Sequence, residues 1–385
     1  MTKKLIAFFI ASSFLSSALG AEISRPGFDQ NRVFKMGSPT PATPLPIEAT
    51  QAYVFNDALS KCQRDVVDLE NELHDFLERP DSEVLLTLKK FFPSFLAKDL
   101  KSVQIFFDSF GSLAQAFASF YIPAQKNLKP TISLDCSQQY KFLTPSLLGH
   151  ELAHHFNSKR GLSPWIDEMI AQMTEIRIKG SFSLERYEAI RNSYAMPSFF
   201  AREKAFKSTH EYGINALFGA YLMENYGGAE VLSAIPNGTK TLSQLSQAVV
   251  QFSKGKKDLD WIRPYMGPRA LIRHFNLALN INLPSVNGGK IFKVPGWRGF
   301  AYGTTIKKVG SYIIEPGGSL RLDPMWGPDF KNFTNSSSLE LYRVLIAGNQ
   351  YQIATIDEAV NGYWEQNFLV LINTSETEYT EIRLQ

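Results

Sequence analysis

The strongest constraint on this chain is a pair of predicted helices that follow one another almost without a break, at residues 144–161 and 163–180. Thr144 and Pro145 form a helix start, with threonine as the N-cap and proline at the first helical position. A Ser-Pro pair repeats this signal in the second segment, and a glycine ends each one. Any fold for the chain must therefore place an acidic helix directly after the first.

The first of these helices carries the sequence HELAH, an HExxH motif, at residues 150–154. Residues four apart share a helical face, so the imidazoles of His150 and His154 can point at one ion while Glu151 borders the same cleft. That arrangement suits zinc with an open coordination position. We expect the two histidines to bind metal and Glu151 to act as the general base. The neighbouring His155 points about 100° away on the helix and is expected to pack rather than to ligate.

A catalytic zinc keeps three protein ligands and a water, so a third ligand is needed. The second helix offers Glu168 and Glu175. Since these two glutamates are seven residues apart, they lie on one helical face, and one can bind the metal while the other orients a ligand. The spacing alone leaves open which glutamate does which.

The string from Trp165 to Glu175 resembles a segment of the gluzincin zinc metallopeptidases, which include the aminopeptidase N and leukotriene hydrolase relatives. That segment reads tryptophan-x-x-glutamate, with a further glutamate seven residues on. The resemblance implies a thermolysin-like zincin core with one Zn²⁺ per chain. It makes Glu168 the third zinc ligand and Glu175 the carboxylate that orients a ligand. Those families usually have glycine after the ligand glutamate, whereas Met169 follows it here.

A second stretch, residues 211–228, resembles the tyrosine-glycine helix that follows the metal helices in secreted bacterial gluzincins of the hyicolysin type. In those enzymes a tyrosine near this point donates a hydrogen bond to the oxyanion, and the matching position is Tyr212. A negative tetrahedral oxygen needs a preorganised donor besides the metal. His210 is the rival donor, and an aromatic residue that begins a helix is also often part of the core.

These residues predict a zinc metalloprotease, a hydrolase whose partner is a peptide or protein substrate. Glu151 would take a proton from a zinc-activated water and pass it to the leaving amine. No exopeptidase signature like that of the aminopeptidase N relatives precedes His150, which favours an endopeptidase. In such an enzyme, residues 130–135 are expected to form the sheet edge that pairs with an extended substrate.

Two alternatives stay open. One is a zincin-like protein that has lost catalysis and serves as a binding module. The other is a surface or carbohydrate-binding protein whose function lies in the C-terminal part of the chain. Its candidate sugar-stacking residues are Trp297, Tyr302, Trp326 and Trp364, although aromatic residues in small β domains are more often core.

Residues 1–20 are typical of a secretory signal peptide. Lys3 and Lys4 precede an apolar stretch at residues 5–15, and small residues follow at 18–20. We therefore expect export to the periplasm or the medium. No later stretch reaches the roughly 18 apolar residues of a membrane span, so no transmembrane segment is expected in the mature chain. Removal of the two lysines lowers the formal charge from +3 to +1, which does not favour a nucleic-acid partner. The sequence does not indicate an oligomeric state.

The expected fold class is α+β, a small sheet with a helical body followed by an all-β, sandwich-like domain. The helical body includes one predicted helix at about 48–77 and a second that follows residues 78–81 and ends at about 96. Helical periodicity returns at about 184–282. Strands are predicted at 103–108, 130–135, 311–314, 339–346, 368–372 and 379–384. The expected parts are a signal peptide at 1–20, a Pro-rich lead-in at 21–48, a metallopeptidase domain at 49–285 and an accessory β domain at 286–385. Cys62 and Cys136 form one disulfide or stay as two buried thiols.

Overall fold

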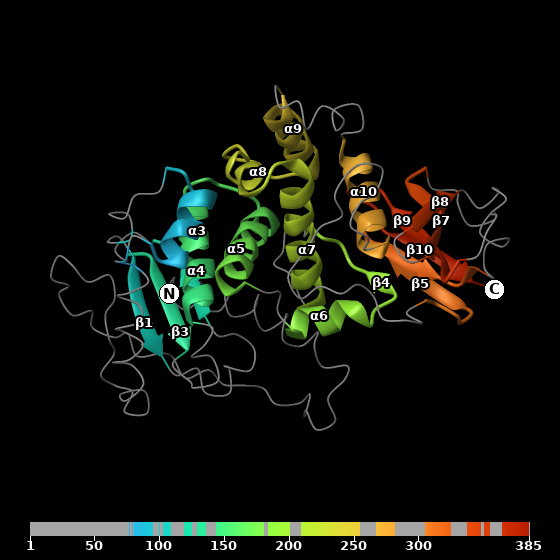
Figure 1. Ribbon diagram of the computed structural model, residues 1–385, viewed down its shortest axis with the longest axis horizontal. Helices are drawn as coiled ribbons and strands as arrows, with labels where there is room; N and C mark the ends of the chain where they lie inside the picture. The colour runs from blue at the N-terminus through green and yellow to red at the C-terminus, as the bar shows by residue number, and fades with distance from the viewer. Residues whose placement is uncertain are drawn as a thin grey trace, which may run out of the picture. The chain divides into compact units, whose positions relative to one another are not determined.

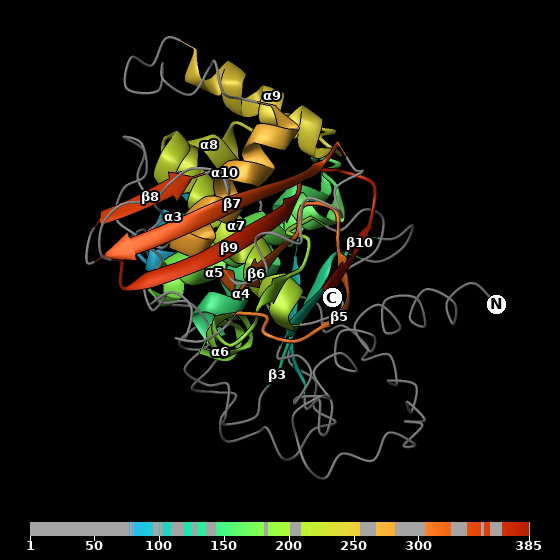
Figure 2. The ribbon, with the colours of Figure 1, turned by 90° about the vertical axis from the view of Figure 1, so that its right-hand side faces the viewer.

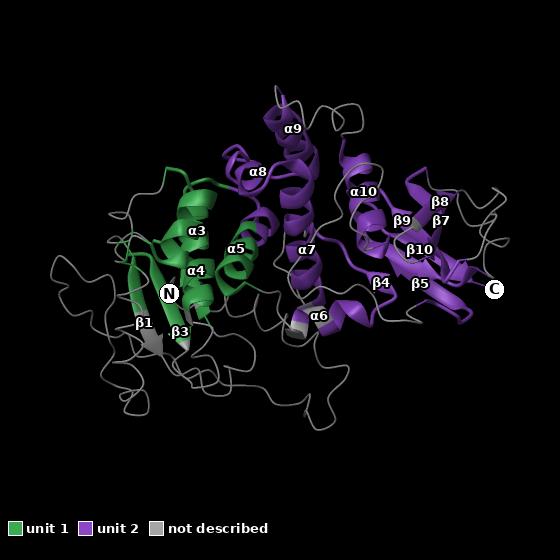
Figure 3. Ribbon diagram, in the orientation of Figure 1, with its two compact units in different colours: residues 1–161, 170–180 green, residues 162–169, 181–385 purple. Residues whose placement is uncertain are grey.

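The computed structural model in Figure 1 describes residues 77, 79, 81–94, 100, 103–108, 119–124, 129–135, 144–180, 184–200, 209–254, 267–281, 305–324, 337–347, 350–354 and 364–384. The signal peptide, the Pro-rich lead-in and both cysteines lie outside the described residues. The chain forms two compact units (Figure 3), one of residues 1–161 with 170–180 and one of residues 162–169 with 181–385.

The first unit contains a three-stranded sheet in the order β1-β3-β2. β1 (Gln104–Asp108) pairs in parallel with β3 (Thr131–Asp135), and β2 (Ser119–Ile122) pairs antiparallel with β3. α4 (Thr144–Ser158) packs against both β2 and β3. The strands predicted at 103–108 and 130–135 are therefore confirmed to within one residue at their ends.

The expectation that residues 130–135 form the sheet edge is wrong. β3 is paired on both sides and is the central strand, while β2 pairs only with β3 among the described strands. Strand order depends on pairing between distant segments, and β2 is only four residues long, too short to show a clear alternation of apolar and polar residues. The edge strand that contacts α4 is β2.

α3 (Glu83–Phe91) illustrates how local sequence fixes a helix in this unit. The Ser82 hydroxyl accepts a hydrogen bond from the Leu85 backbone N–H at 3.2 Å, which satisfies one of the free donors of the first turn. Glu83 lies in the first turn and two lysines in the last, as the helix dipole favours. The helix packs against α4 with its apolar face buried.

α4 and α5 (Pro164–Lys179) approach each other closely at Gly149. A Cβ atom at this position would overlap the Cδ1 atom of Ile178 on α5, so any larger residue would require the end of that side chain to move. Gly180 directly follows Lys179, the last residue of α5, and its φ of 73° is the left-handed conformation that ends a helix, as the sequence predicts. Gly161 also has a positive φ, 60°, but α4 ends three residues earlier, at Ser158.

The second unit contains five helices and an aromatic core among its described residues. The helices are α6 (Leu184–Arg191), α7 (Thr209–Tyr226), α8 (Ala229–Ser233), α9 (Leu242–Ser253) and α10 (Pro268–Ile281). Phe199 and Phe218 are stacked with ring centroids 4.0 Å apart, and Phe275 of α10 meets both rings edge-on at 5.1 Å. This cluster joins α10 to α7.

The described strands of this unit form two antiparallel sheets. The larger has the order β4-β6-β9-β7-β8, and Figure 2 shows β8, β7 and β9 side by side. Its strands are β4 (Ala195–Met196), β6 (Ser319–Leu322), β7 (Leu339–Ala347), β8 (Gln350–Ala354) and β9 (Gln366–Asn373). The smaller pairs β5 (Gly310–Ile314) with β10 (Thr380–Leu384). One apolar cluster includes residues of both sheets, such as Ile314, Leu320, Leu371 and Ile382.

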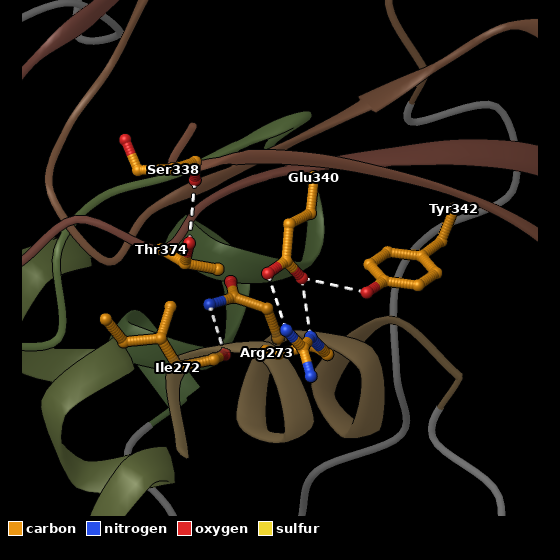
Figure 4. Close-up of polar contacts among 7 residues, drawn as sticks. Ile272, Arg273, Ser338, Glu340, Tyr342 and Thr374 are labelled. Atoms are coloured by element: carbon orange, nitrogen blue, oxygen red, sulfur yellow. Dashed lines mark hydrogen bonds and ion pairs between the residues drawn. The ribbon is translucent and has the colours of Figure 1, made fainter. Parts of the chain in front are cut away.

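A charged network joins α10 to β7 of the larger sheet (Figure 4). Arg273 donates from Nε and Nη2 to the two carboxylate oxygens of Glu340, at 2.5 and 2.6 Å, and the Tyr342 hydroxyl donates to Oε2 of Glu340 at 2.8 Å. Burial alone would raise the pKa of Glu340, but the hydrogen bonds from Arg273 and Tyr342 outweigh it and lower that pKa. A bidentate pair of this kind fixes orientation as well as distance.

Together these elements confirm a mixed class of helices and strands. The four predicted C-terminal strands correspond to β5, β7, β9 and β10. β4 joins the larger sheet from a position before α7, and α6 to α10 belong to the same compact unit as the C-terminal strands. The boundary expected at 285 stays a prediction, since one compact unit can hold more than one domain. No helix among the described residues is long and apolar enough to cross a membrane.

Candidate metal centre

His150 and His154 lie on consecutive turns of α4, and their Nε2 atoms are 3.1 Å apart. The ring centroids are 4.8 Å apart and the ring planes are inclined at 75°. Two nitrogens bound to the same tetrahedral zinc, each about 2.05 Å from it, are separated by about 3.3 Å. The two imidazoles therefore already hold the spacing that a shared metal ion requires.

Glu168 of α5 completes a group of three metal-binding side chains. One ligand atom each from His150, His154 and Glu168 lies within 4.8 Å of the others. His150 is buried, with 9% of its surface exposed, while His154 and Glu168 are partly exposed. Helix α4 and the first half of α5 thus bring together the three residues expected from the sequence, and this group could hold a metal ion.

Glu175 lies two helical turns after Glu168 on α5, beside Nδ1 of His150. Its Oε2 atom is 3.2 Å from Nδ1 of His150, and both side chains are 11% exposed. A proton on Nδ1 is attracted to this carboxylate, and the tautomer that carries it there leaves the lone pair of Nε2 for a metal. Glu175 therefore has the contact expected of a carboxylate that orients a ligand.

Glu151 is 4% exposed, which for an ionised carboxylate requires hydrogen-bonding partners. Its Oε1 atom accepts a hydrogen bond of 2.7 Å from the Ser119 hydroxyl. Ser119 is the first residue of β2, the edge strand that contacts α4. The carboxylate expected to act as general base is thus held by a residue of the sheet.

His155 is packed rather than placed among the metal-binding atoms, as expected. It is 3% exposed, and its Nδ1 atom is 3.3 Å from the Tyr121 hydroxyl. Its ring meets those of Tyr121 and Phe156 edge-on, with centroids 5.9 and 5.2 Å apart. It links α4 to β2.

Met169 is fully buried, and it occupies the position at which the gluzincins that this segment resembles usually have glycine. The preceding Trp165 is also buried, and its carbonyl oxygen accepts a hydrogen bond of 3.1 Å from the Asn215 amide. The first turns of α5 are therefore tied to α7 by packing and by a buried hydrogen bond. The methionine side chain is accommodated within this core.

Tyr212 and His210, the two candidate oxyanion donors, lie at the start of α7 in the second unit. Tyr212 is partly exposed, and the Arg186 guanidinium lies over its ring, 5.9 Å from the centroid. Burial lowers the pKa of His210 to about 4, so its imidazole is neutral near pH 7. The roles of these two residues rest on the resemblance described above.

Sequence reasoning missed Ser119 and Tyr121, which contact Glu151 and His155. Both lie on the four-residue strand β2, and neither belongs to a recognisable motif. Of the four aromatic residues of the sugar-binding alternative, the structure describes one. Trp364 is partly buried, and the other three aromatic residues of that set lie outside the described part of the chain.

No known protein family matches the sequence, and no curated protein or solved structure matches the chain either. The function must therefore be argued from the residues of α4, α5 and β2 and from their geometry.

Proposed function

We propose that this protein is a zinc-dependent endopeptidase of the gluzincin type, with a thermolysin-like core, one Zn²⁺ per chain and Glu151 as the general base. The observation that carries the proposal is the convergence of His150, His154 and Glu168, whose ligand atoms lie within 4.8 Å of one another. We propose further that the chain is exported through its N-terminal signal peptide.

The donor set supports zinc among the common metals. Two imidazoles and one carboxylate are the ligands of a well-known class of catalytic zinc site, in which a fourth position stays open. A zinc ion held here would polarise a substrate carbonyl and lower the pKa of a bound water to about 7. The contact between His150 and Glu175 supports the same conclusion, because it favours the tautomer that ligates through Nε2.

The protein residues around this group suit peptide hydrolysis. Glu151 is adjacent in sequence to one ligand and shares its helix, so its carboxylate can take a proton from water and deliver it to the leaving amine nitrogen. Tyr212 would donate its phenolic proton in a hydrogen bond to the developing oxyanion. His210, neutral near pH 7, could donate only from the ring nitrogen that carries its proton.

The edge strand β2 supports an extended peptide as the substrate. Among the described strands it pairs only with β3, so its other side can form backbone hydrogen bonds with an added chain. A peptide bound in this way would run past Ser119, whose hydroxyl contacts Glu151. We therefore propose β2, and not residues 130–135, as the strand that pairs with the substrate.

Metal analysis beside a proteolysis assay tests the proposal. Purified wild type should contain close to one zinc per chain and should cleave an unstructured protein in a reaction that a zinc chelator stops. Glu168→Ala should lose most of the metal. A wild-type protein that binds no zinc from a zinc-containing buffer would refute the proposal.

A metal-binding protein without catalytic activity is the second candidate. The observation that favours it is Met169, which replaces the glycine usual in gluzincins and is fully buried beside Glu168 in the sequence. Zinc content does not separate the two candidates, but proteolysis does. A zinc-loaded wild type that cleaves no unstructured protein would favour the second.

A further inference from the structure

The hydrogen bond between Ser119 and Glu151 joins the edge strand of the sheet to the proposed general base. The Ser119 hydroxyl donates to Oε1 of Glu151 at 2.7 Å, across 32 residues of sequence. Ser119 is partly buried and Glu151 is 4% exposed. A hydrogen bond to a buried carboxylate is short and strong, because the acceptor is charged.

A second contact shows that the placement of Ser119 is fixed by the fold. Ser119 and Tyr121 lie two residues apart on one face of β2, about 6.7 Å along the strand. Their partners Glu151 and His155 lie four residues apart on α4, about 6 Å along the helix. The strand and the helix thus match at two successive points, and the backbone of Ser119 is held opposite Leu134 of β3.

This geometry affects how Glu151 can work as a base. A carboxylate has two oxygens, and a base must hold its accepting oxygen within hydrogen-bond reach of the proton it takes. A glutamate side chain has three rotatable bonds, and the hydrogen bond from Ser119 at 2.7 Å restricts the positions that the carboxylate can take.

We propose that Ser119 is a positioning residue for the proposed reaction, and that its hydroxyl, which donates to Oε1, holds the Glu151 carboxylate in place for proton transfer. This inference rests on the proposed zinc peptidase function. Ser119 touches neither the ligand group nor the proton that moves, and it acts through Glu151.

Peptide-cleavage kinetics on zinc-loaded protein test the role. Ser119→Ala should lower kcat about 10- to 100-fold with KM changed less than about twofold, because a misplaced base slows the chemical step and not substrate binding. Ser119→Thr, which keeps the hydroxyl and suits a strand, should recover most of the lost rate. Zinc content should match wild type in both variants.

Tyr121→Phe is the matched control. It removes a hydroxyl from the same face of the same strand, but one that contacts His155 instead of Glu151. Its kcat should stay within about threefold of wild type if the effect of Ser119 is local. An equal loss in Tyr121→Phe and Ser119→Ala would show that both changes merely disturb the packing of β2, and the inference would fail.

The crystal structure of the zinc-free protein tests the position of the Glu151 carboxylate without an activity measurement. In wild type the Glu151 carboxylate should lie against Ser119, and in Ser119→Ala it should shift or become less ordered. A single unchanged position in Ser119→Ala, or unchanged kcat, overturns the role of Ser119 and leaves the peptidase proposal standing. A wild type that binds zinc and hydrolyses no peptide overturns both.

Discussion

Oε2 of Glu175 lies 3.2 Å from Nδ1 of His150, while Nε2 of the same ring lies 3.1 Å from Nε2 of His154. The His150 imidazole thus has the Glu175 carboxylate near one ring nitrogen and the His154 ring near the other. The carboxylate favours a proton on Nδ1 and so leaves Nε2 able to bind a metal. The proposed function therefore gives Glu175 and Glu168 different tasks, although they lie on one face of α5.

Glu175→Gln should weaken zinc binding about 10- to 100-fold, because it removes the charge that orients His150 and makes it a better ligand. Glu168→Ala should weaken binding further, since it removes a ligand. Titration with a competing fluorescent chelator measures both. Asp167→Asn, a neutral variant one residue from Glu168 and partly exposed, is the control and should change affinity little. If Glu175→Ala lost all its zinc while Glu168→Ala kept a full zinc content, Glu175 and not Glu168 would be the third ligand.

The parts of the site that could be predicted from the sequence are those set by local periodicity. His150, Glu151 and His154 are a few residues apart on one helix, and the helical repeat alone places them together. Glu168 is predicted from the resemblance of its tryptophan-x-x-glutamate segment, and the start and stop signals of that segment predict its helix, α5. The strands predicted in the C-terminal part also matched, since each has a run of β-prone residues bounded by turns.

The remaining features depend on contacts between distant segments. Ser119 meets Glu151 across 32 residues, and Arg273 meets Glu340 across 67. No local pattern encodes either pairing. The place of β3 at the centre of its sheet likewise follows from its pairing with both β1 and β2. A strand such as 131–135 can be predicted as a strand, but its neighbours cannot.

Gly149→Ala should change the free energy of unfolding by less than about 1 kcal/mol. Helix propensity favours alanine by about 1 kcal/mol, whereas moving a side chain off its rotamer costs about 0.5–1.5 kcal/mol. The new Cβ would overlap Cδ1 of Ile178, the end of a flexible and partly exposed side chain that can rotate away, so the two effects should nearly cancel. Urea unfolding measures the difference.

Ile178→Val removes the atom that the new methyl group would meet. In the Ile178→Val background no side chain has to move, so Gly149→Ala should raise the free energy of unfolding by about 1 kcal/mol there, a non-additive result expected of residues in contact. An equal effect of Gly149→Ala in both backgrounds would show that the new methyl group does not meet Ile178.

Glu340→Gln should lower the free energy of unfolding by about 1–2 kcal/mol at pH 7, because it breaks a bidentate, charge-assisted pair. The folded-state pKa of Glu340 is lowered, by hydrogen bonds from Arg273 and Tyr342 and by the charges of Arg273 and Arg269, against the opposing effect of burial. The unfolded chain therefore binds this proton at higher pH than the folded one. The stabilisation is present above the ordinary pKa of glutamate, about 4.5, and is lost as pH falls through the lower folded value.

Urea unfolding of wild type and Glu340→Gln at pH 7 and near pH 3 checks this dependence. The two proteins should differ at pH 7 and converge in acid. His274 also faces this network. Burial and the charge of Arg273 lower its pKa while the charge of Glu340 raises it, so Glu340→Gln should lower the pKa of His274 further. A difference that stays constant from pH 7 to pH 3 would contradict an ionic origin.

Glu151→Gln should separate metal binding from catalysis. The substitution keeps the size of the side chain and lets the amide accept from Ser119, but it removes the carboxylate that takes the proton. Zinc at 100 times its Kd should stabilise the folded protein by about 2.7 kcal/mol, and the thermal midpoint of Glu151→Gln should rise as much as that of wild type. Glu168→Ala should show little rise at the same zinc concentration. Proteolysis should vanish in both variants, and residual cleavage at the wild-type rate by Glu151→Gln would exclude Glu151 as the base, since no amide can replace a carboxylate in that step.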